Sequence, residues 1–418
     1  MLDQQLIKQQ SRLIKLLQYA KTNVAYYRNI IPKGMDLVKL TSSSEEWAKF
    51  PILEKKDIQA HWQNLISIKY QQNNHKPITI RSTSGSTGVP LKIARADSEL
   101  LMQAVRIWSA RTKRFPEIMN KKVFSLNTHP EGDSANILHI TKNGVVDFSF
   151  QSFDDNIDKI KRFKPEWVYG FSTAVFRFAQ YCKSNNIKLP SLQMIEVTGE
   201  QLFDYQRKII HEVFECDVVN QYGCQEVDFL AYECKCNKMH AWTNHLIIEV
   251  VKNNKPVPDG TLGELVVTSL TNFCMPLIRY RIGDIVMMED TNCTCGNKQQ
   301  ILTPKWGRVG SLLTTSERTI SSNLLKCIFD DFMGQYENSV LEYQVVQIDF
   351  NYMKIYLVPD SKYDKLNTPL GLIKEIKKLL PEVECEVLPV KEIKVSESGK
   401  TKRFIPHLPE NDMSKLIC

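Results

Sequence analysis

The sequence contains no apolar run that approaches the roughly 18 residues of a membrane-spanning helix. Its first residues, Met1 to Gln5, lack the basic-then-apolar layout of a secretion signal. No basic stripe with interleaved aromatic residues is present, which argues against nucleic-acid binding. Internal repeats and low-complexity segments are also missing. We therefore expect a globular, cytoplasmic protein without a membrane span.

Neither sign of charge dominates the composition. The 54 Lys and Arg residues and 47 Asp and Glu residues give a net charge of +7 over 418 residues, a slight excess that favours anionic ligands such as nucleotides. Hydrophobic residues make up 43% and charged residues 24%, as in ordinary globular proteins. The length predicts two or three domains. The 11 cysteines, an odd number without a secretion signal, are expected to be free thiols or metal ligands.

Three patterns follow one another along the chain. Residues 1–70 carry helical patterns. Between 123 and 270, short β-branched runs alternate with helical stretches, which predicts an α/β domain with a β-rich section that extends to about residue 306. From about residue 312 the pattern predicts a small α+β domain. The expected strands are 123–126, 167–169, 194–198, 218–221, 247–251, 265–269, 341–348, 353–358 and 383–389, and the expected helices are 154–162, 174–184, 204–215, 324–332 and 372–380.

Residues 82–92 read Ser-Thr-Ser-Gly-Ser-Thr-Gly-Val-Pro-Leu-Lys and predict a phosphate-binding loop. Two glycines allow a close backbone approach, and the hydroxyl and N–H groups supply neutral donors that suit a polyanion such as a triphosphate. Lys92 adds a positive charge. A flexible linker is the alternative interpretation, but the run lies between ordered-looking segments and ends abruptly at Pro90 and Lys92. The Walker A pattern is absent, which disfavours a P-loop kinase or GTPase.

Residues 83–92 meet every fixed position of T-S-G-S-T-G-x-P-x-K and so resemble the phosphate motif of the adenylate-forming superfamily. Later segments agree in order: 222–226 resembles Y-G-x-x-E, 279–284 resembles R-Y-R-x-G-D, 307–308 resembles the hinge G-R, and 398–403 resembles the loop of the catalytic lysine. The length, the helical start and residues 275–284 resemble the phenylacetate–coenzyme A ligase-like branch, which includes capsule-synthesis and secondary-metabolite relatives.

This resemblance implies an enzyme, an AMP-forming acid–thiol ligase. It would activate a carboxylic acid, aryl or aryl-like, with ATP and Mg²⁺ to an acyl-adenylate and then transfer the acyl group to coenzyme A. Transfer to a carrier-protein thiol or an amine is an alternative, and a zinc-stabilised non-catalytic scaffold is a rival from another class. The implied architecture is a large N-terminal adenylation domain, 1–308, with α/β sheets and a β-rich subdomain, and a small mobile α+β domain, 309–418. It also allows a homodimer.

The resemblance also assigns roles to single residues. Lys400 is the expected catalytic lysine, and Glu226 is the expected Mg²⁺ ligand. The expected ATP-binding residues are Thr83, Ser84, Gly85, Ser86, Thr87, Gly88, Lys92, Gly199, Glu200, Tyr222, Gly223, Asp284 and Arg308. Outside their motifs, each of these residue types has a plainer interpretation: a solvated lysine or glutamate, a core tyrosine, or an aspartate in a turn.

Two cysteine pairs lie about fifty residues apart, at 234 and 236 and at 293 and 295, and a histidine at 240 accompanies the first. Two such pairs and a histidine satisfy the four N and S ligands of a closed structural Zn²⁺ site. The related ligase-like proteins imply Cys234, His240, Cys293 and Cys295 as the ligands and leave Cys236 as a spare or alternative. Free thiols on turns are the competing interpretation.

The aromatic-rich stretch 167–172 is the candidate acyl pocket. The resembled ligases build part of the acid pocket from a corresponding segment, which selects Tyr169, Phe171 and Ser172. Aromatic walls suit an aryl acid, but the same residues, with Phe176, serve equally well as ordinary core. Residues 129–133 are a further candidate border of this pocket.

Overall fold

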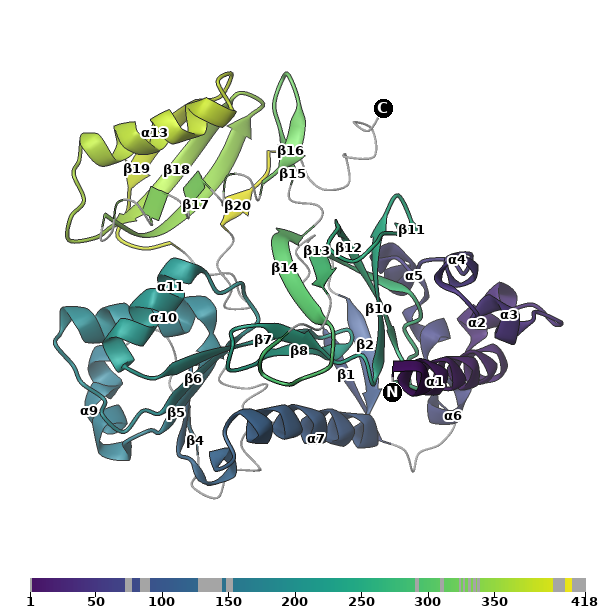
Figure 1. Ribbon diagram of the computed structural model, residues 1–418. Helices are drawn as coiled ribbons and strands as arrows, with labels where there is room; N and C mark the ends of the chain where they lie inside the picture. The colour runs from purple at the N-terminus through teal and green to yellow at the C-terminus, as the bar shows by residue number, and fades with distance from the viewer. Residues whose placement is uncertain are drawn as a thin grey trace. The chain divides into compact units, whose positions relative to one another are not determined.

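The computed structural model describes residues 2–71, 77–82, 91–126, 145–147, 153–289, 293–308, 312–322, 325, 328–329, 332–333, 336, 339–393 and 403–407 (Figure 1). The chain forms two compact units. Unit 1 comprises Met1–Asn120 and Val219–Lys305, and unit 2 comprises Lys121–Val218 and Trp306–Cys418. The domain division into 1–308 and 309–418 stays a prediction. Among the described residues, no helix has the length and apolar composition to cross a bilayer.

Unit 1 begins with a helical layer, as the sequence predicts. In the first helix, Leu13, Leu16, Leu17 and Ala20 follow the i, i+3, i+4, i+7 spacing of one helix face, and all four are buried. Two short helices start at side-chain caps, because Asp36 accepts from the Lys39 N–H and Ser43 from the Glu46 N–H. The helices are α1 (Leu2–Asn23), α2 (Ala25–Ile30), α3 (Leu37–Leu40), α4 (Ser44–Trp47), α5 (Lys55–Leu65) and α6 (Ile68–Gln71).

The strands of unit 1 form a hairpin and a section of a large sheet. Strands β1 (Ile78–Ser82) and β2 (Lys92–Ala96) pair antiparallel, with Ser82 opposite Lys92, and helix α7 (Asp97–Arg114) and the 3-10 turn η1 (Ile118–Asn120) follow. The sheet section has the order β11-β10-β12-β13-β14-β9-β8-β7. Its strands are β7 (Asp217–Cys224), β8 (Asp228–Glu233), β9 (Met239–Ala241), β10 (Leu246–Lys252), β11 (Lys255–Pro256), β12 (Leu262–Ser269), β13 (Tyr280–Glu289) and β14 (Ile301–Arg308).

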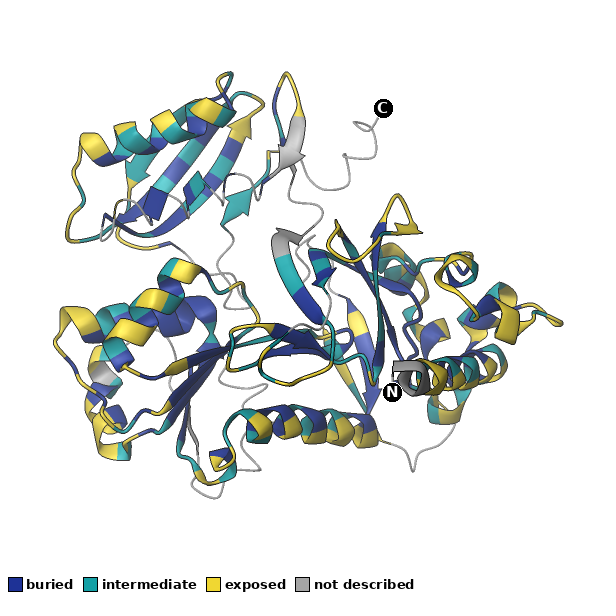
Figure 2. Ribbon diagram, in the orientation of Figure 1, coloured by how far each residue is buried: buried dark blue, intermediate teal, exposed yellow. Residues whose placement is uncertain are grey.

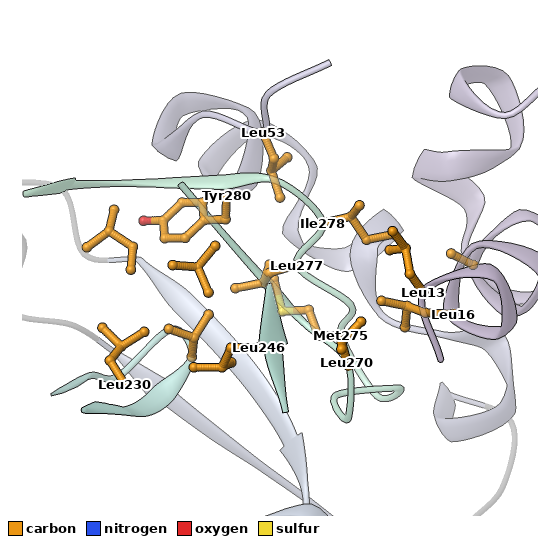
Figure 3. Packing of buried hydrophobic residues seen from close by; sticks show 14 of the residues in the cluster. Leu13, Leu16, Leu53, Leu230, Leu246, Leu270, Met275, Leu277, Ile278 and Tyr280 are labelled. Atoms are coloured by element: carbon orange, nitrogen blue, oxygen red, sulfur yellow. The ribbon is translucent and has the colours of Figure 1, made fainter. Parts of the chain in front are cut away.

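The core of unit 1 lies between the helical layer and this sheet. The segment that leads into β13 supplies Met275, Leu277 and Ile278, none of which is exposed, and Figure 3 shows them beside Leu13 and Leu16 of α1. Fully burying each such side chain contributes about 1.5–3 kcal/mol. The start of β13 is therefore held from its apolar side by the N-terminal helices.

Unit 2 begins with a parallel sheet section of order β6-β5-β3-β4. Its strands are near-continuous apolar runs, as parallel strands covered on both faces require, and Figure 2 shows β5 and β6 buried along most of their length. The elements are β3 (Val123–Leu126), β4 (Val145–Asp147), α9 (Phe153–Phe163), β5 (Trp167–Phe171), α10 (Ser172–Ser184), β6 (Met194–Thr198) and α11 (Asp204–Phe214).

Residues 312–407 add a small α+β layer to unit 2. Strands β17 and β18 form the expected antiparallel pair, while β19 and β20 add to either side of it in parallel, and the order is β19-β18-β17-β20. The helix expected from 372 begins earlier, at Asn367, and only part of the helix expected over 324–332 lies within the described residues. The elements are β15 (Leu312–Thr314), β16 (Thr319–Ser321), β17 (Val340–Asp349), β18 (Tyr352–Pro359), α13 (Asn367–Leu379), β19 (Glu384–Pro389) and β20 (Phe404–Ile405). The α/β fold class predicted from the sequence is confirmed.

We expect Tyr27→Phe to destabilise unit 1. The Tyr27 side chain is buried, its hydroxyl donates to the Pro276 carbonyl at 3.0 Å, and it accepts from the Ile278 N–H at 3.2 Å. Phenylalanine would leave both backbone groups unpaired, at a cost of about 1–3 kcal/mol. Urea unfolding measures this change. The matched control is Tyr26→Phe, because no hydrogen bond of the Tyr26 hydroxyl is found among the described residues. Equal effects of the two variants would contradict the prediction.

Candidate functional site

The end of β7 and the turn that leads to β8 carry three of the predicted site residues: Tyr222 and Gly223 in the strand, and Glu226 in the turn. The ladder shifts register between Tyr222 and Gly223, and a Cβ atom at Gly223 would lie 2.4 Å from the Asp228 carbonyl oxygen. Only glycine permits this approach, so the backbone itself requires the glycine of the Y-G-x-x-E segment. Tyr222 is half-buried, whereas Glu226 is buried.

Tyr222 meets Asp284, which lies 62 residues further along the chain. The Tyr222 hydroxyl donates a hydrogen bond to Asp284 Oδ2, and both side chains are half-buried. Asp284 follows Gly283, whose φ of +90° belongs to the region that glycine favours. The structure thus brings together an aromatic ring and a carboxylate from two motifs. A ring can stack on a base, and a carboxylate accepts hydrogen bonds from hydroxyl groups.

Glu226 is buried at 6% exposure. The Tyr280 hydroxyl donates to its Oε1 at 3.2 Å, and the Tyr280 ring lies in the core shown in Figure 3. Arg95 of β2 donates to the Glu226 carbonyl through Nη2 and to Asp228 Oδ2 through Nε at 3.1 Å. The turn is therefore held by the strand that follows the predicted phosphate loop. A buried carboxylate beside a single phenol fits a hard divalent cation such as Mg²⁺, which prefers oxygen ligands.

Lys92, in the same strand β2, is exposed, and its Nζ lies 5.1 Å from the centroid of the Trp62 ring. This contact is a cation–π interaction at an exposed site, which is weak. Lys92 therefore lies at the start of β2, and its ammonium group forms no strong ion pair with another described residue. The predicted residues Thr83, Ser84, Gly85, Ser86, Thr87 and Gly88 lie outside the described residues, as does Lys400.

Arg279 has a structural function that the motif did not reveal. Its Nε lies 3.1 Å from both carboxylate oxygens of Glu249, and its Nη1 donates to the carbonyl groups of Ala48 and Phe50. Arg279 is 1% exposed and has a φ of +50°. Burial raises the pKa of Glu249 above its ordinary value, although Arg279 acts in the opposite direction. This arginine ties β10 and residues 48–50 to the start of β13.

In unit 2, Gly199 and Glu200 follow β6, at the carboxyl end of a parallel strand. Glu200 Oε2 accepts from the Thr173 N–H at 3.0 Å, and the Glu200 carbonyl accepts from the Ser172 hydroxyl at 3.2 Å. Glu200 thus binds the first turn of α10, where a carboxylate is favourable. Gly199 has a φ of +74°, and a Cβ atom there would lie 2.5 Å from the Phe171 ring. The predicted adenine loop is therefore packed on α10 and Phe171.

The candidate acyl residues lie at the end of β5 and the start of α10. Tyr169 is buried and packs edge-on against Trp167 at 6.3 Å, whereas Phe171 is half-buried. Phe176 is a core residue at 1% exposure. Phe176 is therefore a core residue, whereas the assignment of Tyr169, Phe171 and Ser172 to an acyl pocket stays a prediction. Arg308 ends β14.

The four predicted zinc ligands converge. The ligand atoms of Cys234, His240, Cys293 and Cys295 all lie within 4.8 Å of one another. Cys234 Sγ lies 3.7 Å from Cys293 Sγ, and Cys295 Sγ lies 3.3 Å from His240 Nε2. In a tetrahedral site with Zn–S bonds of about 2.3 Å, two ligand sulfurs lie roughly 3.8 Å apart. The residue types and spacing fit a closed four-ligand Zn²⁺ site.

Hydrogen bonds from neighbouring groups orient the ligand atoms of the cluster. His240 is 1% exposed, and its Nδ1 lies 2.8 Å from the Gln299 carbonyl oxygen, which only accepts. Nδ1 therefore carries the proton and Nε2 keeps its lone pair for a metal. The backbone N–H of Cys236 donates to Cys234 Sγ, and that of Asn297 donates to Cys295 Sγ. The Cys236 thiol instead lies 3.2 Å from Thr294 Oγ1, outside the four.

The thiols of the cluster differ in acidity. Burial would by itself raise the pKa of Cys293, but hydrogen bonds from the Cys295 backbone and His240 lower it to about 6. Burial raises the pKa of Cys234 to about 12, and its hydrogen bond to Cys293 acts in the same direction. The Cys293 thiol is therefore more acidic than the Cys234 thiol. A divalent cation would replace these shared protons.

Several known proteins are similar to this chain in sequence. The CapK C-terminal domain family matches residues 312–406. Protein CapK of Staphylococcus aureus is 28% identical over 88% of this chain and 81% of its own length. A phenylacetate–coenzyme A ligase of Thermus thermophilus is 25% identical over 73% of this chain and 70% of its own length.

Solved structures share the fold. A 2-hydroxyisobutyryl-CoA ligase in the postadenylation state with 2-HIB-AMP superposes with a TM-score of 0.77 at 17% identity, over 98% of this chain and 91% of that one. An anthranilate CoA ligase with anthranoyl-AMP gives a TM-score of 0.59 at 15% identity, over 79% of this chain and 67% of that one. The chain is therefore similar in sequence to CapK and to phenylacetate–coenzyme A ligases, and it shares the fold of adenylate-forming CoA ligases.

Proposed function

We propose that this protein is an AMP-forming ligase that converts a carboxylic acid to its coenzyme A thioester through an acyl-adenylate. The observation that carries the proposal is the contact of Tyr222 with Asp284, beside the buried carboxylate of Glu226. These groups belong to two motifs of the family, and packing brings them to one place in unit 1. The relatives named as phenylacetate–coenzyme A ligases support the same reaction class.

The first half-reaction joins two anions. A carboxylate oxygen of the acid attacks the α-phosphorus of ATP, and pyrophosphate leaves. Alignment and charge neutralisation supply most of the rate in such phosphorus chemistry. Tyr222 stacks on adenine, Asp284 accepts the ribose hydroxyls, and Lys92 and residues 83–88 hold the phosphates. Mg²⁺, bound by Glu226, would supply positive charge to the phosphates. Gly199, Glu200 and Arg308 are further residues that we assign to nucleotide binding.

Lys400 is the proposed catalytic residue. Its charge bridges the substrate carboxylate and the α-phosphate while the new bond forms, which is stabilisation aimed at the transition state. In the second half-reaction the thiol attacks the acyl carbon and AMP leaves. A small domain, 309–418, which moves relative to residues 1–308 between the half-reactions, would remove Lys400 from the site before the thiol enters.

We also propose a class of acid, an acyl acceptor and a structural metal for this protein. Tyr169, Phe171 and Ser172 line an acyl pocket for an aryl or aryl-like acid, since aromatic walls suit an aromatic ligand. Coenzyme A is the proposed acceptor. We further propose that Cys234, His240, Cys293 and Cys295 hold a structural Zn²⁺, because four ligands leave no open position for catalysis. Incubation of purified protein with ATP and a panel of acids, followed by separate addition of coenzyme A, carrier protein or amine, identifies both substrates by mass spectrometry.

Glu226→Gln and Asp284→Ala are expected to slow adenylate formation by about 2–4 kcal/mol at the transition state. Glutamine can still accept from Tyr280 but lacks the charge for Mg²⁺, so this variant should also need more Mg²⁺ for half-maximal rate. Pyrophosphate exchange at varied Mg²⁺ and ATP concentrations measures both effects. Asp259→Ala is the control, since Asp259 is exposed and contacts Gln300. Normal rate and unchanged ATP KM in both variants would refute the assignments.

Elemental analysis after dialysis is expected to find about one zinc per chain. Cys293→Ser should lose the metal and unfold at a lower temperature, because metal binding is coupled to folding. Cys236→Ser is the matched control: its thiol is two residues from a ligand and faces Thr294, so zinc and stability should be retained. Zinc loss from the control but not from Cys293→Ser would show that the ligand set is wrong.

Lys400→Ala is expected to damage adenylation alone. An interaction made only in the transition state lowers kcat and kcat/KM together, with little change in substrate binding. When pre-formed acyl-adenylate is supplied, thioester formation should run close to the wild-type rate. Lys391→Ala, which replaces an exposed lysine nine residues earlier in the chain, serves as the control. Equal losses in both half-reactions would mean that Lys400 is structural or serves both steps.

A further inference from the structure

Helix α7 carries a buried arginine, Arg106, whose charge has no carboxylate partner among the described residues. The residue is 8% exposed. Its Nη1 donates to the Thr271 hydroxyl at 3.0 Å, whereas its Nε is buried without a hydrogen bond, and no bond of Nη2 occurs within the described part of the chain. Nε and Nη2 together form the edge of a guanidinium group that binds two oxygens of an oxyanion at once. This edge of Arg106 is therefore available to a ligand.

Two carboxylates act on Arg106 electrostatically, but both are bound to other groups. Burial lowers the pKa of Arg106, and Asp228 and Glu99 act in the opposite direction. The Asp228 carboxylate accepts from Arg95 Nε at 3.1 Å, and the Glu99 carboxylate accepts from the Phe273 N–H at 2.6 Å. A buried charge is costly unless it is paired. The described residues therefore supply no direct counter-ion for the positive charge of Arg106.

A second arginine and a histidine lie near Arg106. Arg12 of α1 is exposed, and its Nη1 donates to the carbonyl group of Asn244, the residue before His245. The Nδ1 atom of His245 is buried and has no hydrogen-bond partner among the described residues. Burial lowers the pKa of His245 to about 4, and Arg106 and Arg12 act in the same direction. Both arginines are therefore close enough to His245 for their charges to act on it.

The connection between β9 and β10, residues 242–245, is held in place around His245. Gln9 of α1 donates through Nε2 to the carbonyl groups of residues 243 and 246, each at 2.9 Å. The Leu270 N–H donates to the His245 carbonyl at 2.9 Å, and the His245 ring stacks on Trp242 with centroids 5.9 Å apart. All of these elements belong to unit 1. Because the groups are already positioned, a ligand that binds here loses little affinity to ordering of the chain.

We propose that Arg106, Arg12 and the connection 242–245 form a binding site for a phosphate group, two oxygens of which bind Nε and Nη2 of Arg106. Two guanidinium charges match a phosphate group, which carries about two negative charges near pH 7. None of these residues is among those assigned to ATP, and the inference does not depend on the proposed ligase reaction. Inorganic phosphate and the ribose phosphate of coenzyme A are two sources of the same chemistry.

The binding test compares wild type with Arg106→Gln, which keeps a polar side chain but loses the charge and the two-pronged edge. Calorimetric titration with inorganic phosphate, acetate, coenzyme A and dephospho-coenzyme A, at constant ionic strength, measures the affinities. The phosphate affinity should fall about tenfold or more in Arg106→Gln, because charge-assisted hydrogen bonds are strong. Arg12→Gln, at an exposed position, should also bind phosphate more weakly. The matched control is Lys113→Gln, which removes one exposed positive charge from the same helix and should leave the affinity unchanged.

Thermal unfolding supplies a second readout. In phosphate-free buffer, Arg106→Gln should be at least as stable as wild type, because the substitution removes a buried charge that has no counter-ion. Phosphate should then raise the unfolding temperature of wild type more than that of the variant, since a ligand stabilises the state that binds it. If Arg106→Gln does not fold, the affinity of Arg12→Gln decides, because Arg12 is exposed.

The two sources of phosphate give different results, and both support the site. Tighter binding of coenzyme A than of dephospho-coenzyme A, with the difference lost in Arg106→Gln, would identify the ribose phosphate. Equal binding of these two, with a phosphate affinity that Arg106→Gln loses, would identify free phosphate. The inference is overturned if the variants bind phosphate as wild type does, if acetate binds as tightly as phosphate, or if wild type binds none of the phosphate probes at millimolar concentration. No arm of the test needs turnover, so an inactive ligase would leave its result unaffected.

Discussion

The buried pair of Arg279 and Glu249 is the constraint on which the candidate site of unit 1 depends. It joins β10 to the start of β13, and Arg279 also holds the carbonyl groups of residues 48 and 50. Breaking one half of such a pair costs about 3–5 kcal/mol, because the other charge is left buried. Tyr280 and Asp284 follow on the same strand, and their hydroxyl and carboxylate contact Glu226 and Tyr222. Buried contacts outside the site therefore fix the geometry of the site.

The cysteine and histidine cluster also involves β13 and β8, through the segments that follow these strands. Cys234 follows β8, His240 lies in β9, and Cys293 and Cys295 lie in the connection between β13 and β14. A metal at this point would join the end of β13 to β8, the strand that follows the turn of Glu226. A metal bound here and the Arg279 pair would therefore constrain one substructure at two places. This is the physical reason why a metal remote from the chemistry can matter for it.

The secondary structure was largely predictable where buried residues follow a simple pattern in the sequence. Strands 123–126 and 194–198 have the predicted bounds, because strands buried on both faces are short, uninterrupted apolar runs. Helix α7 was not predicted, since its buried face includes Glu99, Arg106 and Arg111, and these charged residues interrupt the apolar periodicity that reveals a helix. Strands β1 and β2 were also missed, because each has only five residues and includes charged or hydroxyl side chains.

The sequence by itself determined the chemistry of the motifs, because a phosphate loop, a Mg²⁺ carboxylate and zinc thiolates each require particular residue types at short spacing. The resemblance to ligase-like proteins, rather than spacing alone, selected the four residues that meet around the proposed zinc, and it left Cys236 as an alternative. Only the tertiary structure decided that Cys236 turns toward Thr294, that Arg279 is buried against Glu249, and that Arg106 reaches Thr271. The reason is that these contacts join residues up to 165 positions apart, or depend on where a side chain points. No local pattern encodes the packing that brings such residues together.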